Sequence, residues 1–325
     1  MKILYASQNN PSSKIQLARF LQAMQGKMHT IKVAAFKKSS PENIPIDWTL
    51  DCLQDIFKPD IISCNNDNYE IYFNQVKKYN PDLIISDMEY YTSQIAIDLN
   101  ITLWQCSSAL INFGLTNDYK YNLGAFKKYS FLLSKKSIEN QRLLNIQDNS
   151  DKNYIYSHFG DCSNKPKIKS NYDWIKPYHQ LGKISATCGH NIIGNMIGSN
   201  KKLLDLLCRY QDSICFTDFP HENYMSVIIK NIDNQEEYFC NIKNSDYFAC
   251  SGETSFLADA YYNNKYSIVL TDLNNSECIM NSIISEKLQL SSSVYNSNEN
   301  LDLSKCPNIN SNSNNKFLHE KIEEF

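Results

Sequence analysis

The stretch from Ser245 to Asp272 constrains the fold most, because it has the pattern of a strand, a tight turn, a helix and a second strand. Residues 247–250 form a short, mostly apolar and aromatic run that is typical of a buried strand. Gly252 ends this run and can take backbone angles that side chains forbid. Apolar residues then recur at helical spacing, and residues 267–270 resemble the next strand. Such a unit predicts parallel strands covered by helices.

The start of the helix in this unit is a candidate anion site. A helix that follows a tight turn exposes free backbone N–H groups and the positive end of its dipole, which suits a phosphate or diphosphate. Thr254 and Ser255 add hydroxyl donors at the same end. The alternative is an ordinary turn whose hydroxyls only cap the helix. The local sequence leaves both interpretations open.

The same rhythm of strands and helices recurs along both halves of the chain, which predicts two parallel α/β domains facing a central cleft, each Rossmann-like. We place the first domain at residues 1–181, the second at 182–315 with the boundary near Gly182, and a terminal helix at 316–325 that packs back on the first domain. We expect an irregular connection over residues 165–178 and a Ser- and Asn-rich loop over 291–315. The predicted strands are residues 2–6, 30–35, 61–62, 82–86, 102–105, 154–158, 191–197, 213–217, 227–229 and 238–242, and the predicted helices are 14–24, 47–57, 69–79, 93–99, 125–133, 135–144, 201–210 and 277–288.

Composition excludes several classes of protein. The formal net charge is -3, so there is no global basic field for nucleic acid. The 11 cysteines contain no C-x-x-C pair, which argues against a zinc ribbon or a redox motif and indicates a reducing cytoplasm. The first apolar run is too short for a signal peptide, and no run is long enough to span a bilayer. We therefore expect a soluble cytoplasmic protein.

Two carboxylates, Asp87 and Glu89, follow the predicted strand at residues 82–86. The carboxyl ends of parallel strands are where such sheets place ligands and acid–base groups. Either carboxylate could act on a substrate, the pair could hold a divalent ion, or Asp87 could cap the next helix. Ser12 and Ser13 belong to the polar loop after the first strand, which ends at the same edge of the sheet.

Several motifs resemble those of the GT-B glycosyltransferases, and most closely the family-28-like group that includes the peptidoglycan GlcNAc transferase. Residues 80–87, NPDLIISD, resemble that group's PDLVISD strand, and residues 251–260 resemble its GGxxTxxEA donor-binding turn. Residues 265–270 and 277–281 resemble its GKPVLVLP and EQxxNA segments. The chain departs from the family in the loop after the first strand, which has neither a histidine nor a run of glycines, and it has few arginines to hold a diphosphate.

The resemblance implies a sugar transfer from a nucleotide-diphosphate donor, with a UDP-sugar favoured, to an acceptor hydroxyl. Neither a metal nor a cofactor is implied, because backbone N–H groups and hydroxyls of the turn would hold the diphosphate. Glu277 would bind sugar or ribose hydroxyls, and Gly194 would let the backbone approach the donor. The implied donor-binding residues are Gly194, Gly252, Glu253, Thr254, Ser255 and Glu277.

The acceptor would enter past Ser12 and Ser13, with Asp87 or Glu89 as the base and His190 or His221 as alternatives. A small molecule, a lipid, a protein or a modified nucleic-acid base all remain compatible as acceptor. Two rival functions share the expected architecture: a nucleotide-sugar 2-epimerase, and a non-catalytic protein that binds a nucleotide sugar or a nucleic acid. A panel of nucleotide sugars separates them by transfer, epimerisation or binding without turnover.

Overall fold

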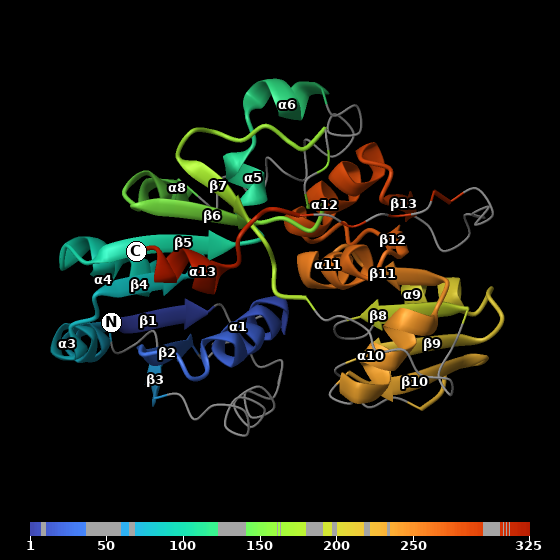
Figure 1. The fold of residues 1–325 in the computed structure, drawn as a ribbon, viewed down its shortest axis with the longest axis horizontal. Helices are drawn as coiled ribbons and strands as arrows, with labels where there is room; N and C mark the ends of the chain where they lie inside the picture. The colour runs from blue at the N-terminus through green and yellow to red at the C-terminus, as the bar shows by residue number, and fades with distance from the viewer. Residues whose placement is uncertain are drawn as a thin grey trace.

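The chain folds into two parallel sheets that lie side by side, each covered by helices on both faces (Figure 1). This computed structural model describes residues 1–7, 11–36, 60–64, 69–122, 141–160, 162, 164–179, 191–196, 200–217, 222–232, 235–294, 306–307, 309, 311 and 313–325. The helices expected at 47–57 and 125–133 and the boundary near Gly182 lie outside these residues, as does most of the helix expected at 135–144. Within the described ranges, no helix is both long and apolar enough to cross a membrane.

The first sheet has seven strands in the order β3-β2-β1-β4-β5-β6-β7, and its neighbouring strands pair in parallel. Its strands are β1 (Lys2–Ser7), β2 (Thr30–Phe36), β3 (Asp60–Cys64), β4 (Leu83–Ser86), β5 (Thr102–Ser107), β6 (Lys152–Tyr156) and β7 (Tyr172–Ile175). The helices of this part are α1 (Pro11–Met24), α3 (Tyr69–Tyr79), α4 (Tyr90–Asp98), α5 (Ile111–Gly114), α6 (Asn117–Asn122) and α8 (Gln141–Asp148).

The second sheet has six strands in the order β10-β9-β8-β11-β12-β13, again paired in parallel. Its strands are β8 (Ile192–Met196), β9 (Ser213–Thr217), β10 (Val227–Asn231), β11 (Tyr247–Cys250), β12 (Tyr266–Leu270) and β13 (Ser291–Val294). The helices of this part are α9 (Lys201–Leu207), α10 (Gln235–Asn244), α11 (Thr254–Tyr262) and α12 (Ser276–Lys287). The last helix of the chain, α13 (Leu318–Glu323), returns to the first sheet. The prediction of a doubly covered parallel α/β fold is confirmed.

Alternate residues of the first sheet enter different cores, because successive side chains of a strand point to opposite faces. Ile3 and Tyr5 pack with α1 and α13, whereas Leu4 and Ala6 pack with α3 and α4. Covering both faces explains the nearly continuous apolar character of the central strands. Each fully buried side chain of this kind contributes about 1.5–3 kcal/mol.

Three predicted elements are wrong, each for a physical reason. Residues 238–242 belong to helix α10, because Tyr238 and Ile242 lie one helical turn apart and both pack under the second sheet. The expected loop after residue 290 begins with β13, whose serines are short enough to lie beneath α12, where Ser293 Oγ donates to Ser282 O (3.2 Å). The expected irregular connection contains β7, an edge strand of the first sheet.

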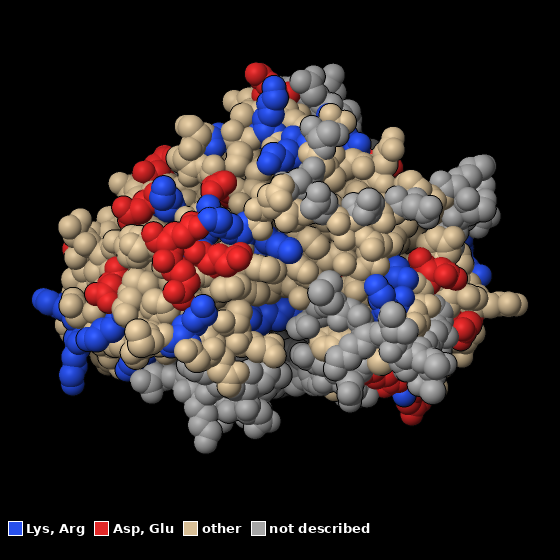
Figure 2. Space-filling view, viewed as in Figure 1, with Lys and Arg blue, Asp and Glu red and all other residues tan. Residues whose placement is uncertain are grey.

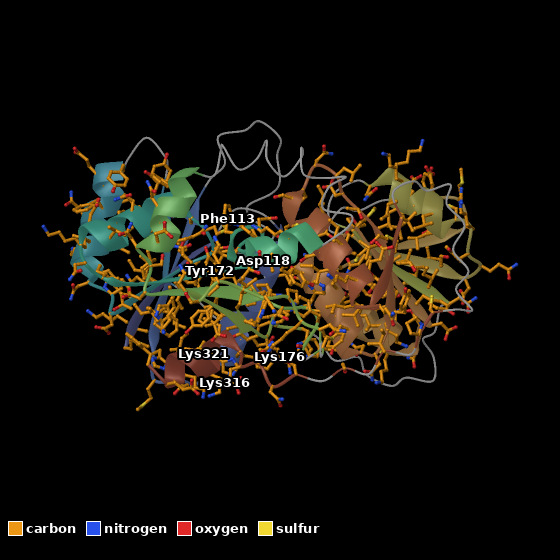
Figure 3. All side chains as sticks on the ribbon, turned by 90° about the horizontal axis from the view of Figure 1, so that it is seen from above. Phe113, Asp118, Tyr172, Lys176, Lys316 and Lys321 are labelled. Carbon is orange, nitrogen blue, oxygen red and sulfur yellow. The ribbon has the colours of Figure 1, made fainter. Side chains whose placement is uncertain are left out.

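Two chain segments connect the domains on one edge of the molecule. Lys176, which follows β7, donates its backbone N–H to the carbonyl of Lys316, which precedes α13 (2.9 Å). Figure 3 shows Lys176, Lys316 and Lys321 together on this edge. The helix α13 then packs on the first sheet, and the Phe325 ring lies 5.3 Å from that of Trp104.

A second, apolar contact joins the domains. Ile279 and Ile283 of α12 pack against Ile111 and Phe113 of the α5 region. The arrows of β1 and β5 in Figure 1 point toward the second sheet, so the carboxyl ends of these strands lie at the junction of the two domains. That is the edge at which parallel sheets place their ligands.

Candidate functional site

Helices α1 and α11 hold the two domains together beside the site. The Arg19 guanidinium of α1 forms a two-pronged ion pair with the buried carboxylate of Asp259 (Nη1–Oδ1 3.0 Å, Nη2–Oδ2 2.9 Å). Gln16 Nε2 donates to Ser255 Oγ (3.0 Å) and to the Tyr178 carbonyl (2.9 Å). Because these contacts lie in the first turns of α11, they fix the start of this helix against the first domain.

The turn before α11 requires glycine. Gly252 has a φ of +106°, a region that L residues rarely adopt, and a Cβ there would lie 3.0 Å from the Cys278 carbonyl oxygen. Asn281 of α12 donates to the Gly252 carbonyl and to Thr254 Oγ1, both at 2.9 Å. The sharp turn predicted at Gly252 is confirmed, and α12 holds it in place.

The start of α11 already faces a carboxylate of the protein. Glu277 Oε1 accepts from Thr254 Oγ1 (3.0 Å) and from the Thr254 backbone N–H (3.4 Å). Burial raises the pKa of Glu277, and hydrogen bonds from Ser108 and Thr254 oppose that shift. Because Ser108 follows β5 of the first sheet, Glu277 spans the two domains at the site. A carboxylate of the protein therefore lies at the positive helix end, and the binding of a diphosphate there stays a prediction.

Asp87 faces this helix start from the first domain. Its side chain is only 5% exposed and lies within hydrogen-bonding distance of Ser107 and Ser13. Burial raises the pKa of Asp87 to about 6; the two serines oppose the shift and the charge of Glu277 adds to it. The structure thus brings together Asp87, Ser13 and Glu277, which are far apart in the sequence.

Glu253 adds another buried carboxyl group at the turn. Burial raises its pKa to about 7, and the charges of Glu277 and Asp272 add to the rise. Its Oε2 atom is buried and has no hydrogen-bond partner among the described residues. Glu253 is also the N-cap residue of α11, but its side chain makes no cap hydrogen bond. It is therefore about half protonated at neutral pH, and its side chain does not bond to the helix end.

The structure corrects the hypothesis that Glu89 is a base. Glu89 is the N-cap of α4, and its two carboxylate oxygens accept from the backbone N–H groups of Tyr91 (2.9 Å) and Thr92 (2.7 Å). The helix-capping role that we considered for Asp87 thus belongs to Glu89. Among the described residues, no group of three or more His, Cys, Asp and Glu side chains is arranged to hold a metal ion.

Gly194 lies in the middle of β8, inside the strand predicted at residues 191–197, and a Cβ there would come within 2.4 Å of Leu207 Cδ1. Its expected contact with the donor stays a prediction. The close approach that this glycine permits is that of α9 to the sheet. Ser12 and Ser13, expected in a loop, lie in the first turn of α1. The Ser12 side chain, His190 and His221 lie outside the described part of the chain.

Ser107, Ser108 and Asn281 were not among the predicted site residues. Ser107 and Ser108 lie where β5 ends, so the rule that ligand groups collect at the carboxyl ends of parallel strands could have found them. Asn281 lies one helical turn after Glu277 and therefore on the same face of α12.

The chain shares its fold with solved glycosyltransferase structures. Over 90% of this chain and 84% of the other, it superposes on CalG4, the calicheamicin glycosyltransferase, with a TM-score of 0.59 and 10% identity. It superposes on Arabidopsis thaliana UGT89C1 complexed with UDP-L-rhamnose over 94% of this chain and 88% of the other, with a TM-score of 0.58 and 10% identity. It also superposes on the spinosyn rhamnosyltransferase SpnG complexed with thymidine diphosphate over 91% of this chain and 87% of the other, with a TM-score of 0.54 and 9% identity.

These likenesses define the class of fold. Two parallel-sheet domains with a junction at their strand ends form the GT-B architecture that the sequence resemblance predicted. No protein-family model matches the chain, and no curated protein matches its sequence. At about a tenth identity the shared feature is the fold, and the narrower resemblance to the family-28-like group stays a prediction.

Proposed function

We propose that this protein transfers a sugar from a nucleotide-diphosphate donor, with a UDP-sugar favoured, to a hydroxyl group of an acceptor. The observation that carries the proposal is that Glu277 accepts from Thr254 at the start of α11 and is close enough to the buried Asp87 for its charge to raise the pKa of that carboxyl group. A buried carboxylate and a helix end that attracts anions are the two groups that glycosyl transfer needs: a base and a diphosphate site.

The donor diphosphate would bind at the turn formed by Gly252, Glu253, Thr254 and Ser255. The Thr254 backbone N–H and hydroxyl, which now donate to Glu277, would donate to phosphate oxygens without a metal ion. Glu277 would then bind sugar or ribose hydroxyls. As the bond from the anomeric carbon to phosphate oxygen breaks, the helix end would stabilise the charge that develops on the leaving diphosphate.

Asp87 would be the base. The acceptor hydroxyl would give its proton to the Asp87 carboxylate while its oxygen forms the new bond to the anomeric carbon. With a pKa of about 6, Asp87 is ionised at neutral pH and more basic than an ordinary aspartate. Ser13 and Ser107 would orient the carboxylate, and the acceptor would enter past Ser12 and Ser13 in the first domain.

The ligands named for the similar structures support the proposed class of donor. Two of the similar structures hold thymidine diphosphate and UDP-L-rhamnose. The proposal also includes the narrower resemblance to the family-28-like group and a cytoplasmic location. It divides the chain into an acceptor domain (residues 1–181), a donor domain (182–315) and a returning C-terminal helix (316–325).

The test is incubation of the purified protein with UDP-, GDP-, dTDP- and CMP-sugars, with and without EDTA. Release of the nucleoside diphosphate, or transfer of the sugar to an added acceptor, is the expected result, and EDTA should leave the rate unchanged. D87N should abolish the reaction and retain donor binding. An epimerised donor, or binding without any turnover, would contradict the proposed transfer.

A further inference from the structure

One face of helix α1 contacts both the proposed base and the start of α11. Ser13, in the first turn of α1, lies within hydrogen-bonding distance of Asp87. Gln16, one turn later, donates from Nε2 to Ser255 Oγ at the start of α11 (3.0 Å). Residues three positions apart on a helix are neighbours on its surface and lie about 4.5 Å apart along its axis. The base and the diphosphate site of the proposed transfer are therefore tied to the same turn of α1.

The orientation of the Gln16 amide is fixed by the segment that follows β7. Gln16 Oε1 accepts from the Tyr178 backbone N–H (2.8 Å), and Gln16 Nε2 donates to the Tyr178 carbonyl (2.9 Å). Reversing the amide would place its NH2 group against the Tyr178 N–H and its oxygen against the Tyr178 carbonyl, so Nε2 is the atom that faces Ser255. The Gln16 side chain is buried, and both of its polar atoms have partners. Gln16 therefore holds Ser255 with a side chain that is itself locked in place.

Tyr178 is anchored to the first domain. Its hydroxyl accepts from the His319 backbone N–H of α13 (3.1 Å), and its ring lies 6.1 Å from that of Phe20 in α1. In Figure 2, acidic and basic side chains lie mixed over α13. Lys321 of this helix pairs with Asp173 of β7 (3.2 Å), which ties α13 to the first sheet. Tyr178 thus belongs with the first domain, and the bond from Gln16 to Ser255 crosses to the second.

Ser255 adjoins the groups that would bind the diphosphate. The neighbouring Thr254 presents its backbone N–H and its hydroxyl to Glu277, and Glu277 is close enough to Asp87 for its charge to raise the pKa of that carboxyl group. A closed ring of contacts therefore runs from Asp87 through α1 to Ser255 and back through Glu277. A shift of Ser255 would change the distance between the proposed base and the donor.

Arg19 keeps the two helices together independently of Gln16. Its two-pronged ion pair with Asp259 lies one helical turn further along both α1 and α11 (3.0 and 2.9 Å). Losing the Gln16 amide should therefore displace the start of α11 without separating the domains. The ion pair supplies attraction between the helices, whereas the Gln16 amide determines where Ser255 lies.

We propose that Gln16 is a positioning residue of the sugar transfer, which sets the distance between the Asp87 carboxylate and the start of α11 through its bond to Ser255. This inference rests on the proposed function. Gln16 acts through Ser255 in this role, so it should affect the rate of transfer much more than the affinity for the donor. A misplacement of about 1 Å can cost about a hundredfold in rate.

The test compares Q16M with wild type in steady-state release of the nucleoside diphosphate from whichever nucleotide sugar reacts in the donor panel. Methionine has a similar length and forms none of the three amide bonds. Q16M should lower kcat at least tenfold and keep the affinity for UDP, measured by calorimetry, within threefold of wild type. Because both changes remove the same bond, Q16M/S255A should be no slower than S255A.

The matched control is Q105M. Gln105 is also buried, and its amide donates to Ser93 within the first domain (2.8 Å). Q105M should keep kcat within twofold of wild type. An unchanged kcat in Q16M, an equal loss in Q105M or additive losses in Q16M/S255A would overturn the proposal. A tenfold loss of UDP affinity in Q16M would also overturn it, because Gln16 would then act on donor binding.

Hydrogen exchange gives a readout that needs no turnover. The backbone N–H groups of residues 254–257 should exchange at least threefold faster in Q16M than in wild type, and equal exchange would overturn the positioning of α11 by Gln16. The two possible failures differ in the kinetic assay. If the proposed function is wrong, wild type releases no nucleoside diphosphate; if only the role of Gln16 is wrong, wild type and Q16M release it at equal rates.

Discussion

Replacing Asp87 by asparagine should change how stability depends on pH. In the folded protein, burial raises the pKa of Asp87 from 3.8 to about 6. Between these two pH values the unfolded chain loses the Asp87 proton while the folded chain keeps it, so the wild-type free energy of unfolding falls as pH rises. At 1.36 kcal/mol for each pH unit, a shift of roughly two units is about 3 kcal/mol. The asparagine of D87N does not titrate, so this fall in the free energy of unfolding is absent from the variant.

The assay is urea denaturation of the wild type and D87N from pH 4.5 to pH 8. The stability of D87N relative to wild type should rise over this range by about 2 kcal/mol, since part of the effect falls below pH 4.5. D118N, which removes an exposed carboxylate of α6, is the matched control and should show no such trend. A difference between D87N and wild type that stays flat from pH 4.5 to 8 would refute the buried, proton-binding environment assigned to Asp87.

Three further predictions follow from contacts at the junction. G252A should lower stability by about 2 kcal/mol or more and lower the Tm, because its φ of +106° is unfavourable for alanine and its Cβ would meet the Cys278 carbonyl; an unchanged Tm would contradict the turn geometry. R19M should destabilise the fold by about 3–5 kcal/mol in urea denaturation, because it removes the positive charge that faces the buried Asp259 carboxylate, and adding D259N should restore part of the loss. E277Q should bind inorganic pyrophosphate, which has no ribose hydroxyl for Glu277 to hold, several-fold more tightly than wild type in calorimetry, because it removes a negative charge from the start of α11; weaker binding would show that the charge of Glu277 does not oppose the diphosphate.

Much of the fold could be predicted because its central strands are buried on both faces. Apolar runs such as residues 247–250 and 213–217 give the strands directly, and the helical spacing over residues 69–79 gives α3. The run at residues 238–242 shows the limit of this reasoning. Four apolar or aromatic residues out of five suit a buried strand or a buried helix equally, and only the packing of Tyr238 and Ile242 beneath the sheet decides for the helix.

Only the part of the site that depends on local sequence could be predicted. The turn at Gly252 is local, so one glycine between a strand and a helix was enough to find it. The roles of Asp87 and Glu89 depend on where each side chain points after the strand ends. Glu89 reaches the free N–H groups of α4, whereas Asp87 faces Ser13 and Ser107, and no spacing rule separates the two carboxylates in advance.

The most direct measurement of the central claim compares UDP with UMP by calorimetry, since the two ligands differ by the phosphate that the start of α11 should bind. We predict that UDP binds at least tenfold more tightly than UMP and that T254V, which lacks the donating hydroxyl, loses most of that difference. T92V removes another buried hydroxyl, which bonds to Tyr72 in the first domain, and should keep the difference. Equal affinity for UDP and UMP in the wild type would contradict a diphosphate site at α11.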